Sequence, residues 1–280
     1  KHMANLGDVI ASLAGLKKYY EITGKKIIFC QQLNVEANYY AGAVHPTTSN
    51  EGVQVMMNER MFEMMKPLLL SQEYIEDVVI FSGQKIDIDL DVIRGKTFVN
   101  MPNQAIQQWI MLAYPDLAAD LSKAWISVDG VIDISNCNLK YDNLPATEMP
   151  INNLSDKIIL NFTERYRNHI INYYFLKQHQ NQLVFAGTEN EKNIFCDKWG
   201  LDIPYLKIKN FLQLAAIVKK SKFLLSNQSF LWNICEAMKT PRILELCQYA
   251  ANCQPFIGED SYGFYHQVGV EYYFEKLMNK

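Results

Sequence analysis

The sequence lacks the features that mark several large classes of protein. It has no run of about 18 apolar residues, so we expect no transmembrane helix, and it shows no signal-peptide pattern. Positive charge is not in excess, because the formal net charge is -3. The chain therefore has no overall basic field for non-specific nucleic-acid binding, although a local basic patch is not excluded. With 280 residues, 49% of them hydrophobic, we expect a cytoplasmic globular protein long enough for two domains.

Disulfide and metal patterns are also missing. The six cysteines are scattered without a Cys-x-x-Cys pair, so we expect them to be reduced and mostly buried. None of the five histidines lies at zinc-ligand spacing to a cysteine, so we expect no zinc site. Asp87, Asp89 and Asp91 alternate with apolar residues. A strand there would place three carboxylates on one face, which suits either a metal site or, as we favour, a solvated sheet edge.

The most informative stretch lies between residues 223 and 246. Its pattern predicts half of a βαβ unit followed by a further strand. The unit consists of an apolar run at Phe223–Leu225, a polar turn at Ser226–Ser229, a helix at Phe230–Met238 and a strand at Arg242–Leu246. Ligands bind at such turns in open α/β sheets, because free backbone N–H groups and the positive helix end face the crevice. The alternative is that the polar side chains of this turn only cap the helix.

A similar turn lies near the beginning of the chain. Gly7 and Asp8 stand just before a helix predicted over Val9–Tyr20, and the glycine permits a tight turn. Asp8 either caps that helix, which we favour from its position alone, or is a general base held at the mouth of a sheet. Since only three residues precede Ala4, we expect the strand before this turn to be very short or to begin before the numbering does.

The other predicted elements alternate between strands and helices. Strands are expected at 25–31, 75–81, 125–128, 157–161 and 183–186, and helices at 58–70, 103–113, 190–199, 211–219 and 270–278. Loops are expected at 32–56 and 247–263. Residues 135–156 are polar with two prolines, which predicts a linker. We therefore predict an α/β fold with two Rossmann-like domains, residues 1–145 and 146–280, whose parallel sheets face each other across a cleft.

A turn dense in polar groups, Phe162–Asn168, follows the strand at 157–161. Its arginines suit bidentate binding of phosphate, or they pair with acids in a solvated loop. Further loops follow Ala186, Leu225 and Leu246. If the sheet is parallel, these loops converge on one edge.

At these positions the chain resembles the ADP-heptose heptosyltransferase-like glycosyltransferases, which have the two-domain GT-B fold. The similar residues are Leu6-Gly7-Asp8-Val9, the turn after Asn161 and the unit from Leu225 to Pro241. The resemblance covers the whole chain but is distant, and the best look-alikes are uncharacterised bacterial or phage-like members.

The resemblance implies transfer of a sugar from a nucleotide-diphosphate sugar to an acceptor hydroxyl, without a metal or a cofactor. Asp8 matches the family's general base, with Asn5 and Gly7 beside it on the acceptor side. The implied donor-binding residues are Thr163, Arg165, Arg167, Asn168, Gly187, Thr188, Asn227, Gln228 and Ser229. The acceptor stays open between a glycan, a lipid, a protein and a modified nucleic-acid base.

Several positions depart from the family pattern. The family's Asp is Asn227, its Gly is Ser229, and its His falls on Trp232; the proline usual near Ala14 is absent. These departures motivate a second interpretation, a non-catalytic GT-B-like binding or virion-associated protein. A third is a different nucleotide-dependent enzyme on the same scaffold.

Overall fold

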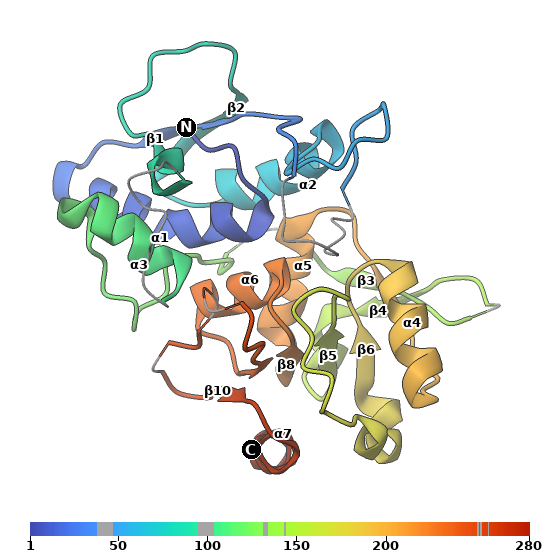
Figure 1. Cartoon of the computed structure of the whole chain (residues 1–280). Coiled ribbons are helices and arrows are strands. Elements are labelled where there is room, and N and C mark those ends of the chain that lie inside the picture. The colour runs from blue at the N-terminus through green and yellow to red at the C-terminus, as the bar shows by residue number, and fades with distance from the viewer. Residues whose placement is uncertain are drawn as a thin grey trace.

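A computed structural model describes residues 1–37, 47–94, 104–130, 134–142, 144–250, 252, 254–256 and 258–280. The chain forms a small sheet in its first half and a large sheet in its second half, with helices packed between them (Figure 1). Part of the loop predicted at 32–56 lies outside the described residues. So does Asn103, the first residue of the helix predicted at 103–113.

The small sheet consists of parallel strands β1 (Ile27–Gln31) and β2 (Ile75–Ile80), close to their predicted positions. His2 forms a parallel bridge beside β1: its N–H donates to Cys30 O at 2.9 Å, and its carbonyl accepts from Gln32 N at 2.8 Å. The residues before the Gly7-Asp8 turn therefore lie along the edge of this sheet, in the place expected for a very short first strand.

In the described part of the chain, the large sheet has eight strands in the order β10-β9-β8-β5-β6-β7-β3-β4. Its parallel strands are β5 (Ile158–Asn161), β6 (Leu183–Phe185), β7 (Tyr205–Lys207), β8 (Phe223–Ser226), β9 (Arg242–Glu245) and β10 (Ser261–Phe264). The chain moves outward from β5 through β6 to β7, and then returns to β8 on the other side of β5. This reversal makes a topological switch point, and ligands of open α/β sheets bind outside the carboxyl ends of the strands at such a point.

Each face of the large sheet packs into a hydrophobic core, because successive apolar side chains of a strand point to opposite faces. Ile159, Leu224 and Leu244 belong to the core that contains α5 (Phe211–Lys220) and α6 (Phe230–Met238). Ile158, Leu160, Phe223, Leu225 and Ile243 belong to the opposite core, with α4 (Glu189–Trp199) and α7 (Gln267–Met278).

The core with α5 and α6 also joins the two halves of the chain. It includes apolar side chains of α1 (Leu6–Thr23), α2 (Glu59–Leu70) and α3 (Ile106–Ala113). Figure 1 shows α5 and α6 in the middle of the molecule, between the small sheet with its helices and the large sheet. The start of α6 is thereby held against the first half of the chain.

The predicted linker at 135–156 is wrong. This stretch contains an antiparallel hairpin of β3 (Asn136–Lys140) and β4 (Thr147–Pro150), and β3 pairs with β7 at the edge of the large sheet. Only Cys137 and Leu139 of β3 are fully buried, so its alternation is too short to stand out from a polar composition. The hairpin spans residue 145, and the division into two domains stays a prediction.

The predicted strand at 125–128 is absent, and so is the sheet edge favoured for the alternating aspartates. Residues 125–128 form an irregular segment, in which the N–H groups of Trp125 and Ile126 donate to Ala237 O of α6 at 2.9 and 3.3 Å. The alternating aspartates end in a 3-10 helix, Leu90–Arg94, where Asp91 is buried and accepts from Met3 N at 2.9 Å. Both segments are fixed by distant contacts rather than by a strand ladder.

The cysteines agree with their prediction as far as they are described. Cys30, Cys137, Cys196, Cys235 and Cys247 are all free and buried, and Cys253 lies outside the described residues. In the described part of the chain, no helix is both long enough and apolar enough to span a bilayer.

Candidate functional site

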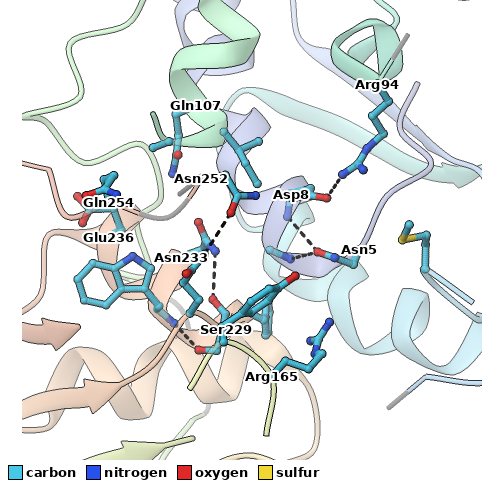
Figure 2. Close-up of a pocket in the computed structure, with 18 residues that line it drawn as sticks. Asn5, Asp8, Arg94, Gln107, Arg165, Ser229, Asn233, Glu236, Asn252 and Gln254 are labelled. Carbon is cyan, nitrogen blue, oxygen red and sulfur yellow. Dashed lines mark hydrogen bonds and ion pairs between the residues drawn. The ribbon is translucent and has the colours of Figure 1, made fainter. Parts of the chain in front are cut away.

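A cavity of about 240 Å³ lies between the two halves of the chain (Figure 2). Residues at the beginnings of α1 and α3 line it from the first half. The turns after β5 and β8 line it from the second half, together with part of α6 and the segment after β9. The cavity therefore lies at the switch point of the large sheet, and three of the four loops predicted to converge, those after β5, β8 and β9, line it.

The beginning of α1 brings Asp8 to the cavity. Asn5 is the N-cap of this helix, because its Oδ1 accepts from Gly7 N at 3.1 Å and from Asp8 N at 3.3 Å. Our preferred interpretation of Asp8 as the cap is therefore wrong. A Cβ atom on Gly7 would lie 3.1 Å from Asn233 Nδ2, so a glycine lets α1 approach α6 closely.

Asp8 is a buried carboxylate paired with an arginine. Its side chain is 7% exposed, and its Oδ2 accepts from Nη2 of Arg94. Burial raises the pKa of Asp8 above its ordinary value of 3.8, while the positive charges of Arg94 and Arg165 act in the opposite direction. Arg94 was not predicted as a site residue, because it ends a single short 3-10 helix, Leu90–Arg94, that no local motif marks.

The turn after β5 carries Arg165 and Tyr166 to the cavity. Tyr166 has a φ of 55°, a left-handed conformation that bulky residues rarely adopt and that often occurs at functional sites. The fully buried Asn227 fixes this turn: its Nδ2 donates to Arg165 O at 2.6 Å and to Thr163 O at 2.9 Å, and its Oδ1 accepts from Thr163 N at 3.0 Å. Asn227 and Thr163 thus support the wall of the cavity without lining it.

The turn after β8 contributes two of the predicted residues directly. Ser229 is the N-cap of α6, with its Oγ accepting from Trp232 N at 3.1 Å, and it also lines the cavity. Gln228 lines the cavity beside it and donates from Nε2 to Asn252 Oδ1 at 3.2 Å. Ser229 therefore both caps α6 and lines the cavity, so the two interpretations of this turn do not exclude each other.

Three helix N-termini converge on the cavity, those of α1, α3 and α6. The N-cap of α3 is Ala105, which has no side-chain acceptor for the amides of the first turn. Helix N-termini carry partial positive charge, and Arg94 and Arg165 add two full charges. This arrangement suits a bound anion such as a phosphate or diphosphate.

Two residues of the predicted donor loop, Arg167 and Asn168, do not line the cavity. The side chain of Arg167 is only 6% exposed; its Nε donates to Glu245 Oε1 at 3.1 Å, and its guanidinium lies 4.9 Å from the ring centre of Phe162. Asn168 donates its backbone N–H to the same Glu245 oxygen and its Nδ2 to Tyr265 O at 2.9 Å. Both residues hold the turn to β9.

Gly187 and Thr188 also lie outside the cavity lining. Thr188 is the N-cap of α4 and forms a capping box with Glu191, whose N–H donates to Thr188 Oγ1 at 3.2 Å. The Gly187 carbonyl accepts from the Tyr205 hydroxyl at 3.0 Å. Their predicted role in donor binding stays a prediction.

Several lining residues were missed, namely Arg94, Gln107, Asn233, Glu236, Asn252 and Gln254. One signal was present in the sequence: Ser229, Asn233 and Glu236 follow at a spacing of four and three residues, which places three polar groups on one face of a largely apolar helix. In the described ranges, no group of three or more His, Cys, Asp or Glu side chains is arranged to hold a metal ion.

Comparisons with known proteins give a likeness in structure but none in sequence. No family model and no curated protein matches the chain. The structure is similar to E. coli heptosyltransferase WaaC, solved with ADP-2-deoxy-2-fluoro heptose, with a TM-score of 0.57, 11% identity and 98% of each chain covered. It is also similar to the family 9 glycosyl transferase of Veillonella parvula DSM 2008, with a TM-score of 0.47, 12% identity, and 100% of this chain and 88% of that chain covered. The likeness to WaaC confirms the predicted α/β fold of the GT-B type.

Proposed function

We propose that the chain is a glycosyltransferase that moves a sugar from a nucleotide-diphosphate sugar to an acceptor hydroxyl without a metal ion. The observation that supports this most directly is a buried carboxylate, Asp8, beside two arginines in a cavity where three helix N-termini meet. The fold likeness to WaaC, whose structure contains an ADP-sugar, agrees with it. The acceptor class and a cytoplasmic location stay predictions.

Each end of the proposed reaction has a candidate group in the cavity. Asp8 accepts the proton of the acceptor hydroxyl while that oxygen attacks the anomeric carbon. The bond from this carbon to the diphosphate oxygen breaks, and the diphosphate leaves with the bonding electrons. Arg165 and the starts of α3 and α6 stabilise the charge that develops on it, as a bound cation does in other transferases.

Arg94 has a supporting role in this proposal. A buried aspartate tends to hold its proton, which would block a general base, and the neighbouring guanidinium favours the ionised form. The same ion pair makes Asp8 a weaker base than it would be at this buried position without Arg94. An acceptor that displaces Arg94 from Asp8 would restore its basicity.

The first test is ligand binding by thermal shift, with ADP, UDP, GDP, CMP and their sugars. A ligand that binds only the folded protein raises its midpoint by mass action. We expect a shift for one nucleotide-diphosphate class. A flat response to the whole panel at millimolar concentration would contradict the proposal.

The second test is Asp8→Asn, measured by sugar transfer from the donor that the panel identifies. Removing a general base lowers turnover by roughly 10²–10⁴-fold, while donor binding should persist. Asp197→Asn, an exposed position on α4, is the matched control and should keep full activity. Unchanged turnover in Asp8→Asn would remove Asp8 from the mechanism.

A non-catalytic binding protein is the second candidate, and the Asp8–Arg94 ion pair is the observation that favours it. It predicts a clear thermal shift with a nucleotide sugar but no transfer to any hydroxyl acceptor and no hydrolysis. Detectable release of the nucleoside diphosphate from the sugar donor would decide against it.

A further inference from the structure

The cavity has two ends of different chemistry. Arg94 and Arg165 lie above and below Asp8 toward the right of the close-up, where Asn5 caps α1 (Figure 2). The other side is lined by carboxamides, of which Gln107, Asn233, Asn252 and Gln254 are labelled there, and Gln228 is bonded to Asn252. These five amides come from α3, from the β8 turn with α6, and from the segment after β9.

Among the described residues, no cationic side chain lines the amide-lined end of the cavity. Its one ionisable lining group is Glu236, which is fully buried. Arg242 donates to both Glu236 oxygens, at 2.8 and 2.9 Å, and Lys239 donates to Oε1 at 2.6 Å. The two cations are thus engaged with Glu236, and the described cations that line the cavity, Arg94 and Arg165, are at the opposite end.

Gln228 supplies an independent sign of a ligand. Gln228 is only 6% exposed. Its Nε2 donates to Asn252, but its Oε1 accepts no hydrogen bond. Buried amide oxygens are nearly always paired, because leaving one unpaired costs free energy. Since Oε1 is shielded from solvent, a small rotation of the amide toward the cavity would let a ligand hydroxyl donate to it.

We infer that the amide-lined end binds the uncharged sugar ring of the donor and makes Gln228 a specificity-determining residue; this inference rests on the proposed function. Each carboxamide both donates and accepts hydrogen bonds, as each sugar hydroxyl does. The diphosphate is drawn to the arginine end, so the sugar attached to it extends toward the amides. A sugar acid would bury its carboxylate there near Glu236, whose two cations are already paired with it, and no described cation lines this end.

The experiment separates the sugar from the diphosphate. Dissociation constants are measured by calorimetry for ADP-glucose against ADP, UDP-glucose against UDP, and GDP-mannose against GDP, and then for the tightest pair with Gln228→Leu. A site built to bind a hydroxyl loses roughly 10-fold or more in affinity when its partner is removed. We expect that loss for the nucleotide sugar and less than about twofold for the free nucleoside diphosphate. Gln178→Leu, at an exposed position outside the cavity, is the control and should change neither constant.

The preference for an uncharged sugar is tested with the corresponding sugar acid: ADP-glucuronic, UDP-glucuronic or GDP-mannuronic acid. It should bind the wild-type protein about 10-fold or more weakly than the neutral sugar nucleotide. Asn252→Ala repeats the first comparison if Gln228→Leu does not fold.

The outcomes that overturn the inference differ from those that overturn the proposed function. Equal losses for sugar nucleotide and free diphosphate, no loss for either, or equal binding of the sugar acid would each place the sugar elsewhere while leaving the transferase proposal intact. If none of the six ligands binds the wild-type protein, the proposed function fails and this inference fails with it.

Discussion

Arg165 and Arg167 are two residues apart in one turn, yet they have opposite environments. Arg165 lines the cavity and its charge acts on Asp8. Arg167 is buried against Phe162 and paired with Glu245, which is fully buried at the end of β9. One arginine is therefore placed to meet a ligand, and the other ties the turn to the sheet.

The difference shows that residue type and position in a loop do not fix a role. Both arginines suit phosphate binding by their chemistry, and the resemblance offers both as donor ligands. What separates them is the acid on the neighbouring strand: Glu245 accepts from Arg167 Nε, from Asn168 N and from the Tyr173 hydroxyl. Four substitutions test whether the two arginines differ in role.

Replacing the buried arginine should cost stability. Arg167→Met keeps much of the side-chain volume but leaves the Glu245 carboxylate buried without its cation, and breaking such a pair typically costs about 3–5 kcal/mol. We expect a loss of this size in the free energy of unfolding, measured by chemical denaturation.

The control is the double variant Arg167→Met with Glu245→Gln, which removes the unpaired charge and should recover much of the loss. If Arg167→Met instead keeps full stability and loses only nucleotide binding, the two arginines have the same role and the contrast is wrong.

The next prediction concerns the support beneath the turn. Asn227→Asp restores the residue type of the resembling family but removes both N–H donors to the carbonyls of Thr163 and Arg165. A carboxylate there would face two carbonyl oxygens, so we expect a loss of roughly 1–3 kcal/mol in the free energy of unfolding. Asn181→Asp, at an exposed position, should have almost no effect. A stable Asn227→Asp variant with improved donor binding would show that position 227 contacts the ligand.

Asn227 also shows where sequence reasoning stops. The unit around it was predicted closely: β8, α6 and β9 lie within one residue of the expected bounds, because each has a clear apolar period and a polar turn between them. The convergence of its turn with the turn after β5 followed from a parallel sheet. The sequence did not predict whether the Asn227 side chain would face the cavity or the turn after β5. That choice depends on its bonds to carbonyl groups 62 and 64 residues away.

The rest of the site was less predictable for the same reason. Arg94 ends a short 3-10 helix and Asn252 lies in the segment after β9. Each meets its partner, Asp8 or Gln228, through a contact between segments 86 and 24 residues apart within the same half of the chain. The hairpin of β3 and β4 was missed because its strands are short and mostly polar. Local patterns predicted elements and sheet edges, whereas the partners of each polar side chain needed the assembled fold.

Replacing the cavity arginine should affect binding rather than stability. Arg165→Met removes a charged donor from the cavity wall, which should weaken nucleoside-diphosphate binding roughly 10- to 100-fold. The unfolding free energy should stay within about 0.5 kcal/mol of the wild type. Arg60→Met, at an exposed position on α2, should alter neither quantity. A large loss of stability without a change in binding would reverse the assignment of the two arginines.

The smallest expected effect is a change in pH dependence when Arg94 is replaced. Burial raises the pKa of Asp8 above 3.8 and Arg94 opposes this rise, so Arg94→Met should raise the pKa further. Because the proposed base must be ionised, the acidic limb of kcat/KM should move to higher pH in the variant. A raised pKa also means that the folded protein binds this proton more tightly than the unfolded one. The stability contributed by protonated Asp8 is therefore present below pH 3.8 and is lost as the pH rises through the raised value.

Two measurements separate this interpretation from a general loss of structure. The acidic limb should shift in Arg94→Met but disappear in Asp8→Asn, whose residual activity has no carboxylate left to titrate at that position. Arg94→Lys should keep the limb close to its wild-type place, because a cation remains beside Asp8. If the limb stays unmoved in Arg94→Met, then Arg94 does not set the ionisation of Asp8. Of the three arginines compared, only Arg165 would then act on the proposed reaction.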